Sequence, residues 1–144
     1  MTTELKYPVI ESGDIRKAKL LIVDDQPANV LLLEHLLGGA GYVSVASTVD
    51  PSRVCELHRE NHYDLILLDL QMPVMDGFEV MQGLKEIEKG WALPVLVVTA
   101  QPGHRLRALR AGARDFMSKP FDLGEMLGRV RNLLETRLLA SALV

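Results

Sequence analysis

Short runs of consecutive apolar residues recur along the chain, and each of the strongest ends in a polar residue. These runs lie at 19–23, 63–69 and 94–99. Strands that are apolar at successive positions are covered on both faces, which is typical of the central strands of a parallel sheet. Two weaker runs, at 42–46 and 114–117, predict two further strands. The pattern therefore predicts five strands.

Stretches with helical periodicity separate these strands. Pro27 suits the first turn of a helix, and Gly38 and Gly39 are expected to close it. Asp50 is the expected N-cap of the next helix, with Pro51 in its first turn. The five helices are expected at 27–37, from 50, from 76 or 77, at about 103–111 and from about 122 onward.

Five strands that alternate with five helices through short connections predict a doubly wound α/β domain around a five-stranded parallel sheet. Residues 1–17 show neither period, and we expect a flexible leader there. From 123 onward the apolar residues follow a helical period almost to residue 144.

Composition narrows the class of protein. The 144 residues carry a formal net charge of -3, and the arginines of the predicted fourth helix spread around it, so direct nucleic-acid binding is not expected. No run approaches the ~20 apolar residues of a membrane span. Cys55 is the only cysteine, so no internal disulfide forms. We expect a cytoplasmic protein that contacts no membrane.

Charged and hydroxyl side chains follow the predicted strands. The three strongest runs end at Asp24 and Asp25, at Asp69 and at Thr99, and Lys119 ends the fifth strand. In doubly wound sheets, sites form at the carboxyl ends of strands, so these side chains are expected to meet. Two carboxylates ~4 Å apart repel by about 4 kcal/mol at an effective dielectric of ~20, and a bound Mg²⁺ relieves that repulsion. A magnesium ion beside a lysine is also what phosphoryl transfer requires.

These residues, in their order and spacing, resemble the receiver domains of two-component response regulators. The resemblance covers about 18–136 and implies a flavodoxin-like strand order of 2-1-3-4-5. It rests on Asp24-Asp25, on Asp69-Leu70-Gln71-Met72-Pro73 with Asp76-Gly77, on Thr99-Ala100 and on Lys119-Pro120-Phe121.

The resemblance implies a role for each residue of the acidic site. Asp69 is the expected phosphoacceptor, which attacks the phosphorus of a partner's phosphohistidine. Asp25 is expected to ligate Mg²⁺ directly and Asp24 through water, while the backbone carbonyl of Gln71 completes the metal site. Lys119 is expected to contact the phosphoryl group. The peptide bond between Lys119 and Pro120 resembles one that is commonly cis in the family.

The resemblance also implies a switch. Thr99 is expected to move toward the phosphoryl group, and the ring of Phe116 to fill the space that it leaves. The side chains of Gln71 and Gln101 occupy the positions that tune the lifetime of the phosphoryl group, whose rate stays open. Gly77 is expected in a tight turn before the third helix.

The implied partner is a sensor histidine kinase or a histidine phosphotransfer protein. A homodimer is expected through the predicted fourth helix, fifth strand and fifth helix, or through the C-terminal helix. Residues 137–144 outrun the last helix of a receiver, so we expect them to extend it, either as a connector to an output domain or as a dimerising helix.

Three alternatives are open at this stage. A haloacid-dehalogenase-like phosphatase also uses an aspartate nucleophile with Mg²⁺, but it expects Asp-x-Asp after its first strand, where this chain has Asp24-Asp25. A nucleotide- or flavin-binding domain expects a glycine-rich loop at that position. A degenerate receiver that only binds proteins is disfavoured by the complete acidic set. The favoured reading is a signalling domain rather than a turnover enzyme.

Overall fold

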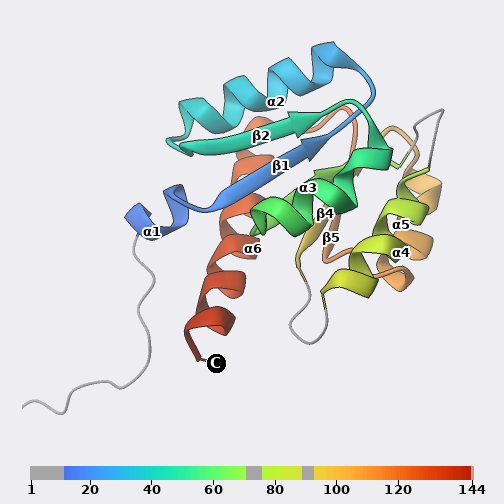
Figure 1. The fold of residues 1–144 in the computed structure, drawn as a ribbon. Coiled ribbons are helices and arrows are strands. Elements are labelled where there is room, and N and C mark those ends of the chain that lie inside the picture. The colour runs from blue at the N-terminus through green and yellow to red at the C-terminus, as the bar shows by residue number, and fades with distance from the viewer. Residues whose placement is uncertain (1–11, 71–75, 89–92, 144) are drawn as a thin grey trace, which may run out of the picture.

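The chain folds into a three-layer α/β structure around one parallel sheet (Figure 1). The computed structural model describes residues 12–70, 76–88 and 93–143. The sheet order is β2-β1-β3-β4-β5, so the predicted doubly wound fold and its strand order are confirmed. The strands are β1 (Lys19–Val23), β2 (Ser44–Thr48), β3 (Leu65–Leu68), β4 (Val95–Thr99) and β5 (Asp115–Ser118).

Helices cover both faces of the sheet. Within the described residues the α-helices are α1 (Ser12–Arg16), α2 (Pro27–Gly39), α3 (Val54–Asn61), α4 (Gly77–Ile87), α5 (Arg105–Arg110) and α6 (Leu123–Leu143). Two short 3-10 turns, η1 (Pro51–Arg53) and η2 (Pro102–His104), precede α3 and α5. None of these described helices combines the length and apolarity needed to cross a bilayer.

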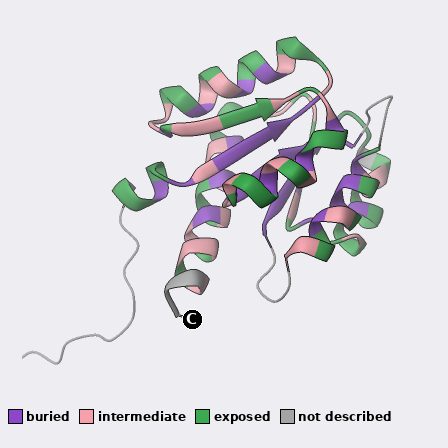
Figure 2. Ribbon diagram, in the orientation of Figure 1, coloured by how far each residue is buried: buried purple, intermediate pink, exposed green. Residues whose placement is uncertain are grey.

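The core is split by the sheet into two clusters, because successive side chains of a strand point to opposite faces. On β1, Leu21 and Val23 join the cluster under α3, α4 and α5, whereas Leu20 and Ile22 join the cluster under α1, α2 and α6. The central strands β1, β3 and β4 are buried almost throughout, as Figure 2 shows, while β2 at one edge is half-exposed. This burial explains the unbroken apolar runs of the sequence.

The expected leader is wrong for residues 12–16, which form α1 and raise the helix count from five to six. Ile15 is fully buried in the cluster under α2 and α6, and α1 packs against α6. One apolar residue among polar neighbours gives no helical period, so this helix depends on tertiary contact rather than on local pattern. Residues 1–11 lie outside the described residues.

The end of α2 and the start of β2 both lie two residues later than the sequence predicted, because the glycines expected to stop the helix do not stop it. α2 runs through Gly38 and Gly39, and the N–H of Ala40 still bonds to the carbonyls of Leu36 and Leu37. The chain turns at Gly41 instead, whose φ of 98° lies in the left-handed region that glycine adopts without strain. β2 therefore begins two residues later than predicted.

Candidate functional site

The backbone hydrogen bonds of the sheet continue one residue past the strands and fix the residues that follow them. At this carboxyl-end edge of the sheet, the Asp69 N–H donates to the Val23 carbonyl at 3.0 Å. The Lys119 N–H donates to the Thr99 carbonyl at 2.8 Å in the same way. The register of parallel strands thus brings residues from distant parts of the chain to one edge.

Three carboxylates and one ammonium group meet at this edge. One carboxylate oxygen from each of Asp24, Asp25 and Asp69 lies within 4.8 Å of the other two. Asp24 and Asp69 are only 2% and 8% exposed. The Lys119 Nζ donates to Asp24 Oδ2 at 2.8 Å and to Asp69 Oδ2 at 3.2 Å. The predicted acidic cluster and its lysine are therefore together in the fold, with three negative groups around one positive group.

Asp24 is held from both sides. Its Oδ1 accepts the backbone N–H of Gln26 at 2.9 Å and the side-chain N–H of Asn29 at 3.5 Å, while its Oδ2 accepts Lys119. Sequence reasoning did not single out Asn29. Its position could have indicated this role, because Asn29 is a polar residue in the first turn of α2, which begins just after Asp24 and Asp25.

The charge state of Lys119 follows from its neighbours. Burial by itself lowers the pKa of a lysine, but the hydrogen bond to Asp24 and the charges of Asp69 and Asp24 raise it more. The net pKa of Lys119 lies above its ordinary value of 10.5, so the ammonium form is held at neutral pH.

Gly77 contacts the backbone that carries Asp69. A Cβ built on Gly77 would lie 2.7 Å from the Leu70 Cα and 2.9 Å from the Asp69 carbonyl oxygen. The close approach of two backbones therefore requires glycine at this position, while residues 71–75 of the expected turn lie outside the described residues. Asp76 caps α4 by accepting the N–H of Glu79 at 2.9 Å. Gln71 lies outside the described residues.

The expected switch residues lie on neighbouring strands. Thr99, the last residue of β4, is fully buried, and its hydroxyl oxygen accepts the N–H of Gln101 at 3.4 Å. Phe116 on β5 pairs in register with Val97 and is buried in the cluster under α3, α4 and α5. The two side chains are therefore placed by the same strand pair.

An apolar groove of about 450 Å³ opens beside Lys119. It separates α2 from the turn between β5 and α6, where the Lys119–Pro120 peptide is cis, as the resemblance implied. Leu32 and Leu123, which line it, are about half-exposed. Its lining consists of Asn29, Leu32, Leu33, Ala100, Lys119, Pro120, Phe121 and Leu123.

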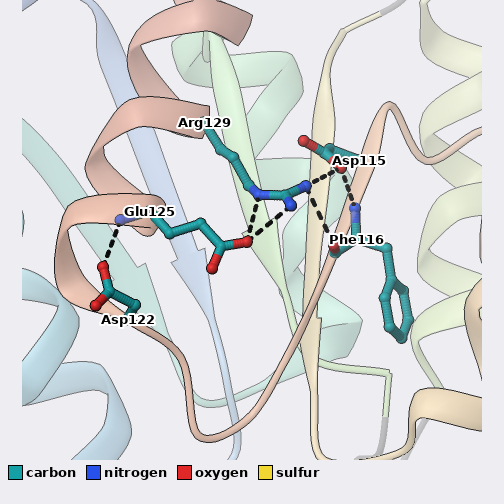
Figure 3. A network of polar contacts seen from close by, with 5 residues as sticks. All are labelled: Asp115, Phe116, Asp122, Glu125 and Arg129. Atoms are coloured by element: carbon teal, nitrogen blue, oxygen red, sulfur yellow. Dashed lines mark hydrogen bonds and ion pairs between the residues drawn. The ribbon is translucent and has the colours of Figure 1, made fainter.

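A second polar constellation ties α6 to β5 next to Phe116 (Figure 3). The Arg129 guanidinium donates to the carboxylate of Asp115, to the carboxylate of Glu125 and, at 3.5 Å, to the Phe116 carbonyl. Asp115 Oδ1 also accepts the N–H of Phe116 at 2.8 Å. Sequence reasoning did not identify this network, because its members are spaced as an ordinary strand and helix surface.

The structure thus combines a doubly wound sheet with three aspartates and a lysine at its carboxyl-end edge. The sequence profile of the response regulator receiver domain matches residues 20–131. The chain belongs to the response regulator receiver family.

The relatives are themselves response regulators. Response regulator PleD of Caulobacter vibrioides is 39% identical over 128 residues, which are 88% of this chain and 28% of PleD. The DNA-binding dual master transcriptional regulator RpaA of Synechocystis is 42% identical over 118 residues, 81% of this chain and 48% of RpaA. The chain thus spans half or less of the length of these curated relatives.

A solved structure gives the same fold with a metal. The receiver domain of the sensor histidine kinase PA1611 from Pseudomonas aeruginosa superposes with a TM-score of 0.75 at 29% identity, over 83% of this chain and 98% of that one. That structure holds a magnesium ion coordinated in its active site cleft.

Proposed function

We propose that Asp69 accepts a phosphoryl group from a phosphohistidine of a sensor histidine kinase or a histidine phosphotransfer protein. The observation that carries the proposal is the Lys119 ammonium held between Asp69 and Asp24, with Asp25 at the same edge. An aspartate with only an ordinary turn or capping role does not need two further carboxylates and a lysine around it.

The transfer balances as a displacement at phosphorus. A carboxylate oxygen of Asp69 forms the new P–O bond while the P–N bond to the donor imidazole breaks, and the imidazole nitrogen leaves with the electron pair. Lys119 compensates the negative charge on the phosphoryl oxygens, which is the main contribution a protein makes to this reaction. Later hydrolysis of the acyl phosphate by water returns Asp69 and releases phosphate, so the domain serves as a timed signal and not as a turnover enzyme.

The acidic cluster suits Mg²⁺. Hard divalent cations prefer carboxylate oxygens, and Asp24, Asp25 and Asp69 offer one each within 4.8 Å. The family resemblance adds the Gln71 carbonyl as a further ligand. When bound, the ion neutralises charge on the phosphoryl oxygens. Lys119 contacts Asp24 and Asp69, and the three carboxylates outnumber this one ammonium group, so a bound cation would reduce the excess negative charge.

The switch is proposed at Thr99 and Phe116. A phosphoryl group on Asp69 adds hydrogen-bond acceptors at the edge where the Thr99 hydroxyl lies. That hydroxyl accepts the N–H of Gln101 at 3.4 Å, a long and weak contact that a phosphoryl oxygen can replace. Displacement of Thr99 frees space that the Phe116 ring fills, which alters the surface around α5, β5 and α6.

The groove between α2 and the β5–α6 turn is proposed to receive the phosphodonor. A donor must bring its histidine to Asp69, so its surface also covers what lies beside Lys119. That neighbouring surface is apolar, with Leu32 and Leu123 half-exposed, and it matches the apolar face of a donor helix.

The proposed partner and the single cysteine both fit a cytoplasmic location.

A homodimer is proposed through α5, β5 and α6 rather than through the end of α6. Leu106 on α5 is 58% exposed, and Leu109 on the same helix is also exposed. Along the C-terminal half of α6, by contrast, Leu134 is buried and Leu138 packs against the core, and among the side chains described there Leu139 is the one exposed large apolar residue, at 36%. The molecular mass in solution, with and without beryllofluoride, tests this face. A monomer in both states would refute it.

The acceptor is tested with two aspartates that flank the same strand. Asp69 follows β3 at the carboxyl-end edge and Asp64 precedes it at the opposite edge. Incubation with acetyl phosphate and Mg²⁺ should add one phosphoryl group to the wild type and to Asp64→Asn, but none to Asp69→Asn, as read by intact mass. An adduct that persists in Asp69→Asn would reassign the nucleophile. Lys119→Ala is expected to fold but not to switch.

A further inference from the structure

Another polar cluster, separate from the network around Arg129, lies at the amino-end edge of the sheet, opposite the acidic site. His58 of α3 is fully buried. Its Nδ1 accepts the backbone N–H of Tyr63 at 3.0 Å, which leaves the ring proton on Nε2. That Nε2–H donates to Glu88 Oε1 at 2.7 Å, at the C-terminal end of α4. Both nitrogens of a buried ring are therefore satisfied, and Glu88 is held in place.

Arg137 of α6 lies between two carboxylates of this edge. Its guanidinium is 3.7 Å from Glu88 Oε1 and 3.9 Å from Asp64 Oδ1. The Arg137 side chain is 16% exposed, and both acids are largely buried. Asp64 is itself fixed, because its Oδ2 accepts the Lys19 N–H at the start of β1. Charges this far out of water attract more strongly than an exposed pair does.

The C-terminal half of α6 is also bound by apolar contacts. Leu134 is buried, Leu133 and Leu138 pack against the same cluster, and Ile15 of α1 is buried there too. In Figure 1, α6 continues well past the lower end of the sheet toward the C-terminus. The profile match of the family stops at residue 131, so Arg137 lies outside the part shared with it.

We propose that His58, Glu88, Asp64 and Arg137 form a clamp that makes α6 part of the rigid domain as far as residue 138. Arg137 is the positioning residue: it joins α6 to the end of α4 and to the start of β3. The direction in which the last turns of α6 project is then set by the folded domain and not by free movement of that helix. The clamp uses none of the residues of the acidic site, so it stands or falls independently of phosphorylation.

Hydrogen exchange of the full chain tests the clamp. Arg137→Gln removes the cation and should speed exchange of the amides of residues 133–140 by about threefold to tenfold, because the helix end opens more often. Glu88→Gln should act in the same direction, since its amide oxygen still accepts the His58 proton but no longer attracts Arg137. Arg131→Gln is the matched control, because the ion pair of Arg131 with Glu135 lies within α6 itself.

The exchange rates distinguish a helix end held by Arg137 from one that is held by no specific ion pair. Faster exchange at 133–140 in Arg137→Gln and Glu88→Gln, with amides of β3 unchanged and Arg131→Gln like the wild type, supports it. Equal exchange at 133–140 in all four proteins would overturn it. Equal acceleration in Arg131→Gln and Arg137→Gln would also overturn it, because any loss of charge on α6 would then suffice.

Discussion

The two edges of one sheet differ in how their acidic side chains are partnered. At the carboxyl-end edge, three carboxylates face the single ammonium of Lys119. At the amino-end edge, His58 has a partner for each nitrogen, and Arg137 lies between two acids. At the first edge three carboxylates outnumber one ammonium group, and at the second two carboxylates outnumber one guanidinium group beside a neutral His58. The second edge therefore carries less excess negative charge, and each of its acids has a fixed partner: His58 for Glu88 and the Lys19 N–H for Asp64. The comparison indicates that one edge is built for chemistry and the other for stability.

The largest expected effect comes from a substitution at the amino-end edge. His58→Ala leaves the Tyr63 N–H without its acceptor and opens a cavity, so the free energy of unfolding should fall by about 3 kcal/mol. Urea unfolding measures this loss, and acetyl phosphate should still label the folded fraction. His35→Ala, at an exposed position of α2, should change stability by less than about 0.5 kcal/mol. Equal small losses in both variants would contradict the structural role of His58.

Gly77→Ala should affect both stability and chemistry. Its Cβ cannot fit 2.7 Å from the Leu70 Cα without moving the backbone next to Asp69. We expect a loss of about 1–3 kcal/mol in urea unfolding and slower phosphorylation. At Gly38 no atom lies within 4 Å of an added Cβ, so Gly38→Ala should raise stability by about 0.5–1 kcal/mol and leave phosphorylation unchanged. Normal labelling of a stable Gly77→Ala would show that the close approach does not position Asp69.

Asp25→Asn should stabilise the metal-free protein. Removing one of three crowded carboxylates relieves repulsion, so the free energy of unfolding should rise by about 1 kcal/mol without Mg²⁺. Added Mg²⁺ should then raise the melting temperature less than it does in the wild type. Asp14→Asn, at an exposed position of α1, should leave the magnesium response intact. A variant that is destabilised without metal would mean that the acidic edge is not under charge strain.

The smallest effect is a pH dependence at Lys119. The pKa of Lys119 in the folded state lies above its ordinary value of 10.5. Its contribution to stability is therefore complete below pH 10.5 and is lost as the pH rises through the folded-state pKa. The difference in the free energy of unfolding between the wild type and Lys119→Met should be constant from neutral pH to about pH 10.5. It should shrink as the pH rises from there through the folded-state pKa of Lys119. A difference that already shrinks near neutral pH would contradict the raised pKa.

The sequence predicted the sheet well, because burial on both faces leaves an unambiguous apolar run in each central strand. It predicted the acidic site for a related reason: Asp24, Asp69 and Lys119 directly follow strands, and parallel strands bring those positions to one edge. Their mutual contacts then follow from the strand order.

Features that depend on tertiary contact were beyond the sequence. Ile15 gives no helical period, so α1 was taken for part of a leader. His58 and Arg137 are nearly eighty positions apart in the sequence, and they share Glu88 as a partner only through the tertiary fold. The glycines of α2 misled for a local reason, since Gly41 and not Gly38 or Gly39 supplies the left-handed turn.

Chemical location of the phosphoryl group tests directly whether Asp69 is the acceptor. Borohydride reduces an aspartyl phosphate to homoserine. Compared with unmodified aspartate, the residue then has one oxygen fewer and two hydrogens more, and a peptide map identifies it. After treatment with acetyl phosphate and Mg²⁺, we expect this change at Asp69 alone, and at no residue when Mg²⁺ is chelated. Homoserine at Asp24 or Asp25, or no conversion in a folded protein that binds Mg²⁺, would contradict it.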